Sequence, residues 1–268
     1  MFTIIATSIL IGLVFAPLGC LVLWKKYVYF GDGLAHSSMF AGIVSVMAGI
    51  PVFYAGLISS GIFALMVFRL RMSAGNSAAI GFAANLMISM SLVLAYIAPD
   101  QINITKYLVG DIILAGSDDV ATLICILAVV VLFFASFYKA IILTVLSKDV
   151  AASQGVRVRM LELIFLTILA FSVLSTIKIV GALLVTSIII IPAMTARIIA
   201  KSPLTMIGFA MLFSLIMNLI GMILSFQLDI AFAPMIILSG GAMYLIVTLI
   251  SHNWQKSLVQ GENNKHYT

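Results

Sequence analysis

The sequence predicts an all-α fold, a polytopic transmembrane bundle of 8–9 helices with the N-terminus outside and the C-terminus in the cytoplasm. Of the 268 residues, 63% are hydrophobic and 9% are charged, whereas about 25% of the residues of a soluble domain are charged. Mean hydropathy is +1.26. The apolar runs are long and lack strand-type alternation, so they favour membrane-spanning helices over a barrel. This composition excludes a soluble globular protein.

Nine apolar runs are long enough, or nearly long enough, to cross a membrane, because a helix needs about 20 apolar residues to span roughly 30 Å of hydrocarbon. They are Thr3–Trp24, Tyr27–Ile50, Val52–Phe68, Ser77–Ala98, Val120–Leu146, Leu161–Thr176, Ile179–Ile199, Leu204–Phe226 and Ile230–Ser251. Two are weaker, since Val52–Phe68 is short and Leu161–Thr176 carries Glu162 near its start. We expect a transmembrane permease domain over residues 1–252 and a cytoplasmic tail over residues 253–268.

Basic residues predict the orientation of the bundle, because Lys and Arg are enriched in cytoplasmic loops. With nine spans and the N-terminus outside, only Lys106 and Lys178 fall on the outer side, and Lys139 falls inside a span. The cytoplasmic side collects the remaining basic residues, which are Lys25, Lys26, Arg69, Arg71, Lys148, Arg157, Arg159, Arg197, Lys201, Lys256 and Lys265.

The outer loop over residues 99–119 is acidic, and its middle, residues 104–114, is apolar enough for a short interfacial or re-entrant helix. Its acids are Asp100, Asp111, Asp118 and Asp119. They fit a surface that attracts cations or docks an external partner, and they fit an ordinary solvated loop equally well.

The strongest functional signal is the pair Asp32 and His36, near the start of an apolar run. Ionisable side chains are costly in a membrane and rarely occur there without a function. Four residues of separation place both on one helix face, and a carboxylate beside an imidazole suits a divalent transition metal. Three interpretations are open: a helix cap with a hydrogen bond to a neighbouring helix, a proton relay, and a metal transit site. We favour the metal site.

The depth of the pair agrees with a transport site. In a helix that begins near Tyr27, His36 lies about 13 Å into a core of about 30 Å, near the midplane where transporter sites lie. Gly31 and Gly33 flank Asp32 and let a neighbouring backbone or an ion come close. One Asp and one His are too few for zinc, which takes about four ligands. A two-fold homodimer that faces both pairs toward its axis would supply them.

The chain lacks the motifs of an enzyme or an ATPase. The sequence contains no G-x-x-x-x-G-K-[ST] phosphate loop, and no Ser/His/acid or Cys/His constellation suggests catalysis. We therefore expect a transport subunit that is not an enzyme, has no cofactor of its own and binds only its transported ion transiently. The net charge of +5 follows from the inner loops and does not indicate nucleic acid as a partner.

Two further features predict moving or docking parts. The longest inner loop, residues 146–157, predicts a short amphipathic helix, because Ala151 and Ala152 favour a helix and Gly155 ends it. Such a helix suits docking to another protein. Pro192 removes a backbone hydrogen bond within a late apolar run, so we expect a kink there. The kink fits a hinge or gate as well as ordinary packing.

Four segments, in order along the chain, resemble the metal-type ABC importer permeases, the membrane subunits of bacterial high-affinity zinc and manganese uptake systems. Residues 29–37, Tyr-Phe-Gly-Asp-Gly-Leu-Ala-His-Ser, resemble the family's Gly-Asp-x-x-Ala-His-Ser/Ala signature. The others are the outer segment 107–114, the coupling loop 149–156 and the late helix 180–197. The resemblance spans most of the chain and is closest to the zinc uptake system membrane permease. Lys148 and Asp149 depart from it, since the family often has two or more acids there.

The resemblance implies a permease of an ATP-driven importer for a divalent transition metal, Zn²⁺ first and Mn²⁺ or iron as alternatives. It implies a homodimer in the lipid bilayer of the bacterial inner (cytoplasmic) membrane, cytoplasmic ABC ATPase subunits and an extracytoplasmic metal-binding protein. Asp32 and His36 match the residues that meet the metal in transit. The residues implied in ATPase coupling are Lys148, Asp149, Ala151, Gln154 and Gly155. The alternatives are a gradient-driven cation carrier or channel that uses the same pair, and a membrane scaffold.

Overall fold

The structure is a computed structural model that describes residues 2–97, 116–181 and 185–265. Within these ranges the chain folds into helices and no strands, as the sequence predicts. The ten helices of this part are α1 (Phe2–Trp24), α2 (Phe30–Ala48), α3 (Val52–Ala74), α4 (Asn76–Ile97), α5 (Ser117–Leu146), α6 (Lys148–Ser153), α7 (Val158–Val180), α8 (Val185–Ile199), α9 (Pro203–Leu228) and α10 (Phe232–Lys265).

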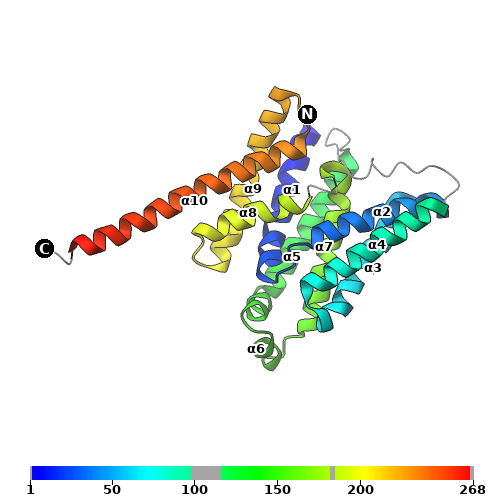
Figure 1. Cartoon of the computed structure of the whole chain (residues 1–268), viewed down its shortest axis with the longest axis horizontal. Coiled ribbons are helices and arrows are strands. Elements are labelled where there is room, and N and C mark those ends of the chain that lie inside the picture. The colour runs from blue at the N-terminus through cyan, green and yellow to red at the C-terminus, as the bar shows by residue number, and fades with distance from the viewer. Residues whose placement is uncertain (1, 98–115, 182–184, 266–268) are drawn as a thin grey trace.

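The helices form two groups on either side of a central set (Figure 1). α2, α3 and α4 pack against one another, and so do α8, α9 and α10. Between the groups, α1 contacts α5, α8 and α9, while α7 contacts α3 and α5. α2 joins the rest of the bundle through α7 and α8. The helix that carries Asp32 and His36 therefore lies where one group meets the centre of the bundle.

Each of the nine predicted spans coincides with one long helix, and α6 lies in the predicted inner loop. In the described part of the chain, seven helices are long and apolar enough to cross a membrane: α1, α3, α4, α5, α7, α9 and α10. α8 is apolar but has only 15 residues, and α2 includes Asp32, His36 and several Gly and Ser residues. These findings define a polytopic helical membrane protein, while the total of 8–9 spans stays a prediction.

Several predicted boundaries are wrong. α3 continues to Ala74 instead of ending at Phe68, and α7 runs over Val158–Val180 rather than Leu161–Thr176. Ile179, the predicted first residue of the next span, therefore belongs to α7. Charged residues set the predicted limits of these runs, yet the helices continue through them.

A buried ion pair explains how α3 continues past its predicted end and how α7 carries an acid inside the bundle. Nη1 of Arg71 in α3 pairs with Oε2 of Glu162 in α7, and the two side chains are only 2% and 3% exposed. The Arg71 guanidinium also donates a 3.3 Å hydrogen bond to the Tyr27 hydroxyl and lies over the ring of Phe68. Since each charge compensates the other, neither one ends its helix.

The start of α2 also differs from expectation. α2 begins at Phe30, later than the predicted start at Tyr27, because the chain turns after α1 with Lys26 in the left-handed region at φ 58°. His36 therefore lies in the second turn of α2. α10 runs from Phe232 to Lys265, and the part of it that is apolar enough to cross a membrane is Phe232–Ser251. The division into a permease domain over residues 1–252 and a cytoplasmic tail stays a prediction. The predicted helix at 104–114 lies outside the described residues.

Four buried aromatic rings hold the start of α2 in place. Phe30 packs against Phe63 of α3 with ring centroids 5.2 Å apart, and Tyr27 packs against Phe30 at 6.2 Å and against Phe165 of α7 at 6.1 Å. All four side chains are fully buried. This cluster fixes the first turn of α2 against α3 and α7, and thereby positions Asp32.

Candidate metal-transit site and the α6 end

Asp32 and His36 lie on one face of the first two turns of α2. Both are only half-buried, whereas residues 33–35 between them are buried against the bundle. A spacing of four residues brings side chains above one another on a helix. The pair therefore shares the more open face of α2, as the sequence predicts.

A third side chain reaches Asp32 from a distant part of the chain. Oγ1 of Thr186, in the first turn of α8, donates a 2.6 Å hydrogen bond to Oδ1 of Asp32. A hydrogen bond to a carboxylate is short and strong because the acceptor is charged. Thr186 was absent from the predicted site, although a hydroxyl at the start of an apolar helix is a signal that could have indicated it.

The two glycines beside Asp32 let neighbouring helices approach. A Cβ atom at position 31 would lie 2.4 Å from Thr186 Oγ1, and one at position 33 would lie 2.2 Å from Cζ of Phe63. Gly31 thus admits α8, and Gly33 admits the Phe63 ring of α3. The sequence predicts that a neighbouring backbone or an ion comes close here, whereas in the structure two side chains make the nearest approaches.

The geometry gives no support to the interpretation of Asp32 as a helix cap. Tyr29 is the N-cap residue of α2 and makes no side-chain cap bond, while Asp32 turns to Thr186 on another helix. Within the described part of the chain, no hydrogen bond reaches Asp32 Oδ2 or either ring nitrogen of His36. Oδ2 of Asp32 and the imidazole of His36 are therefore free to coordinate a metal ion.

The donors that the structure describes in one chain do not complete a metal site. Among the residues that the structure describes, no group of three or more His, Cys, Asp or Glu side chains could hold a metal ion. Asp32 and His36 supply two donors, and a tetrahedral zinc site takes about four. The arrangement can therefore hold an ion weakly, or share it with donors from elsewhere.

The predicted coupling loop folds as the short helix α6. Ser147 caps it by accepting a 3.4 Å hydrogen bond from the Val150 backbone N–H. Ala151 is buried against the bundle, whereas Lys148, Asp149 and Gln154 are exposed. Gly155 follows with a positive φ of 80°, a conformation that favours glycine. The prediction of a short helix ended at Gly155 is confirmed, and its role in coupling is untested.

α6 is tied to the bundle by charge. Lys148 Nζ lies 3.3 Å from Oε1 of Glu162, the acid that also pairs with Arg71. Lys148 is exposed, so its contact with Glu162 is partly screened by solvent. Glu162 of α7 therefore contacts both Lys148 of α6 and Arg71 of α3, and it joins the three helices.

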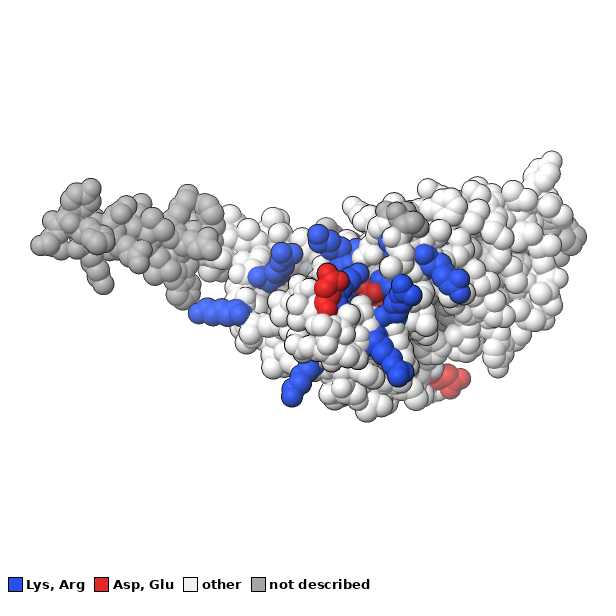
Figure 2. Space-filling view, turned by 90° about the horizontal axis from the view of Figure 1, so that it is seen from below, with Lys and Arg blue, Asp and Glu red and all other residues white. Residues whose placement is uncertain are grey.

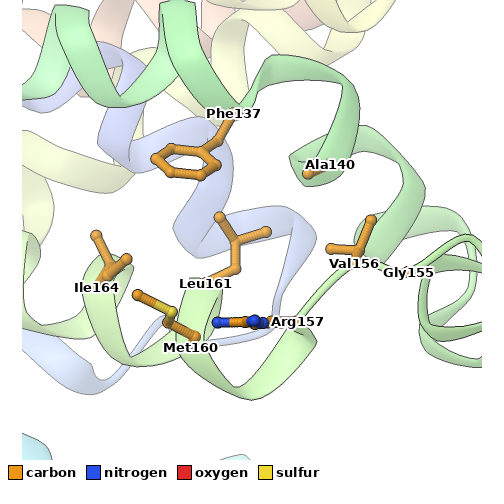
Figure 3. A pocket seen from close by; sticks show the side chains of 8 residues that line it. All are labelled: Phe137, Ala140, Gly155, Val156, Arg157, Met160, Leu161 and Ile164. Atoms are coloured by element: carbon orange, nitrogen blue, oxygen red, sulfur yellow. The ribbon is translucent and has the colours of Figure 1, made fainter.

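A cavity of about 300 Å³ lies where α6 connects to α7 (Figure 3). Phe137 of α5 and Leu161 of α7 project into it from opposite sides, and Arg157 lies near its edge. The segment between α6 and α7 is thus incompletely packed on α5. The cavity therefore lies beside residues 155–157, which follow α6.

Pro192 lies in the interior of α8 and is buried. It has no backbone N–H to donate within the helix. Three residues before Pro192, α8 packs closely on α1. A Cβ atom at Gly19 of α1 would lie 2.1 Å from the carbonyl oxygen of Ile189 in α8. Pro192 therefore sits in a tightly packed contact between α8 and α1, and its predicted role as a hinge or gate is untested.

The helices define a polytopic membrane protein, and ionisable side chains inside such a bundle are typical of ion pathways. Comparison with known families agrees: residues 1–251 match the ABC 3 transport family, and the chain belongs to this family. Such a chain is a transport component of an ABC system and not an enzyme in itself. The resemblance to metal-type ABC importer permeases predicted from sequence is confirmed.

Known proteins are similar over almost the whole chain. The high-affinity zinc uptake system membrane protein ZnuB of Haemophilus influenzae is 27% identical over 92% of this chain and 95% of its own length. The manganese import system permease protein ScaB of Streptococcus parasanguinis is 22% identical over 94% of this chain and 90% of its own. The solved structure of PsaBC from Streptococcus pneumoniae in complex with Fab shares the fold, with a TM-score of 0.78, 20% identity, and coverage of 91% and 89% of the two chains.

Proposed function

We propose that this chain is the membrane permease of an ATP-driven importer of a divalent transition metal, with zinc as the first candidate and manganese or iron as alternatives. The observation that carries the proposal is the half-buried pair Asp32 and His36, with the carboxylate held by Thr186. Ionisable groups within membrane helices mark ion pathways. Free donor atoms on an open helix face suit an ion that must bind and then leave.

The proposed active unit is a homodimer. A second copy related by a two-fold axis brings a second Asp32 and a second His36, which raises the donors to the number that zinc takes. The half-buried state of both side chains in one copy supports this assembly, because a shared site requires a face left open. The ion then passes between the two copies of α2.

The energy source in this proposal is a pair of cytoplasmic ABC ATPases that dock on α6. Figure 2 shows Lys and Arg side chains gathered over the end of the molecule that carries α6. This gathering supports a cytoplasmic location for that end and an inner-membrane protein with its N-terminus outside. α6 is exposed, and a cavity lies beside the segment that follows it, so an ATPase could dock on this helix. An extracytoplasmic binding protein would deliver the ion at the opposite end.

Zinc is preferred because one imidazole per carboxylate suits it, whereas manganese tolerates more oxygen ligands. The relatives named above include a zinc uptake protein and a manganese import protein. The donor set of this chain therefore supports the choice of zinc.

The test is metal uptake into vesicles that contain the chain with its ATPase and binding protein. We expect Asp32→Ala and His36→Ala to lower zinc uptake at least about tenfold, as the loss of groups that tune a metal site does. Met39→Leu, a half-buried side chain on the same helix, is the matched control and should transport normally. Normal zinc uptake by both Ala variants, with the complex intact, would refute the site.

The alternative, a gradient-driven carrier or channel, gives a different result in the same vesicles. The chain alone would then take up zinc in response to a pH gradient, and ATP would have no effect. Uptake that requires both ATP and the ATPase supports the importer.

A further inference from the structure

A second polar cavity lies at the α6 end of the bundle, away from Asp32 and His36. It has a volume of about 300 Å³ and lies where the end of α1, the start of α4, the end of α5 and the start of α6 meet. Three lysines line it: Lys25, Lys26 and Lys148. We call this cavity the lysine pocket. It lies at the α6 end of the bundle, over which Figure 2 shows Lys and Arg side chains gathered.

The lysine pocket carries more positive than negative charge. Glu162 is the one acid that lines it, and this carboxylate already pairs with Arg71 and with Lys148. Within the described part of the chain, neither Lys25 nor Lys26 forms an ion pair. The pocket therefore has cationic groups that an anion could satisfy.

Lys25 is the most deeply buried of these cationic groups and has the greatest need of an anionic partner. It follows the last residue of α1 and is only 9% exposed. Its ammonium group can donate three hydrogen bonds, and in the described part of the chain it donates one, a 3.2 Å bond to Thr144 Oγ1. Burial lowers the pKa of Lys25 to about 8, although the nearby Glu162 carboxylate opposes this effect. A bound anion would stabilise the charged form.

The rim of the pocket favours an anion attached to an apolar tail. Trp24, Val145 and Leu146 also line it, and Leu146 is 77% exposed. Trp side chains are enriched at the membrane interface. Cations inside and apolar side chains at the edge match a phosphate group linked to acyl chains, and basic pockets between membrane helices bind such head groups.

We propose that the lysine pocket binds the phosphate of an anionic phospholipid from the adjacent leaflet. In the orientation proposed above, this is the cytoplasmic leaflet. The lipid lies between the turn that leads into α2 and the start of α6, so it stabilises both segments. The inference is independent of the transported ion, since it stands even if Asp32 and His36 bind no metal.

The test measures lipid binding to the full chain, purified in a neutral detergent in the complex it forms in the membrane. Calorimetric titration compares dioctanoyl phosphatidylglycerol, dioctanoyl phosphatidylcholine and inorganic phosphate. We expect saturable binding of phosphatidylglycerol alone, weakened about fivefold for each lysine replaced in Lys25→Gln and Lys26→Gln. Lys26 is exposed, so its variant keeps the test valid if the Lys25 variant does not fold.

The control is Lys201→Gln, an exposed lysine in the turn between α8 and α9, outside the pocket. It should bind phosphatidylglycerol as the unmodified chain does. Equal binding of phosphatidylcholine, or unchanged binding by both pocket variants, overturns the proposal. Equal binding of inorganic phosphate retains the phosphate site and overturns a lipid as its source.

Discussion

At the scale of single residues, Thr186 sets the direction of the Asp32 carboxylate. Its hydroxyl occupies Oδ1 and leaves Oδ2 for an ion. A hydrogen bond to a charged group contributes about 1.5–3 kcal/mol. We therefore expect Thr186→Val to raise the KM for zinc uptake at least about tenfold. Thr186→Ser keeps the hydroxyl and should retain a KM near that of the unmodified chain.

The KM distinguishes positioning from a general loss of folding, which would lower the amount of complex in both variants. Gly31→Ala provides a second route to the same effect, because its Cβ would displace the Thr186 hydroxyl. The matched control is Gly61→Ala in α3, where a Cβ meets no atom within 4 Å. An unchanged KM in Thr186→Val would show that Asp32 does not depend on this hydrogen bond.

At the scale of helices, the Arg71–Glu162 pair joins α3 to α7 inside the bundle. Removing one partner of a buried ion pair costs about 3–5 kcal/mol, because the other charge is left buried and uncompensated. Glu162→Gln should therefore markedly lower the midpoint of thermal unfolding of the purified complex. Replacing both partners, Arg71→Met with Glu162→Leu, should restore part of the loss, since neither of these two charges remains, although Lys148 and the buried Lys25 lose the nearby carboxylate.

The control for this pair is Arg69→Met, which removes an exposed arginine two positions away in α3. It should leave the unfolding midpoint unchanged. If the double variant is less stable than Glu162→Gln, the charges contribute something other than mutual compensation.

The same ion pair shows what sequence can and cannot predict about these helices. Hydropathy located nine of the ten described helices, all but α6, because apolar length is a local property of the chain. It ended α3 too early, since Arg71 lies beyond the predicted end and is tolerated there only through Glu162, and this pairing depends on how α3 packs on α7. The same holds at the site. Asp32 and His36 are four residues apart and could be predicted as a pair. Thr186 lies 154 residues from Asp32, so its hydroxyl is visible in the sequence while its contact with Asp32 could not be predicted.

At the scale of the whole molecule, the half-buried face of α2 is where we expect the second copy of the homodimer to pack. Asp32 and His36 are half-buried, although the first turn of α2 is fixed by fully buried aromatic rings. Ionisable side chains that face lipid have an unfavourable free energy. A second copy over this face would relieve that cost and bring four donors together, so one surface would serve both dimer formation and ion binding.

Cross-linking tests whether the two copies meet there. The natural cysteines, Cys20 and Cys125, are first replaced by alanine, and cysteine then replaces His36. Because a two-fold axis brings equivalent residues face to face, we expect a short bifunctional thiol reagent to join two chains in membranes. Leu132→Cys on α5, 67% exposed, is the matched control and should give little cross-linked dimer. Cross-linking through position 132 and not through 36 would place α5 at the axis, and each chain would then need other donors to hold its ion.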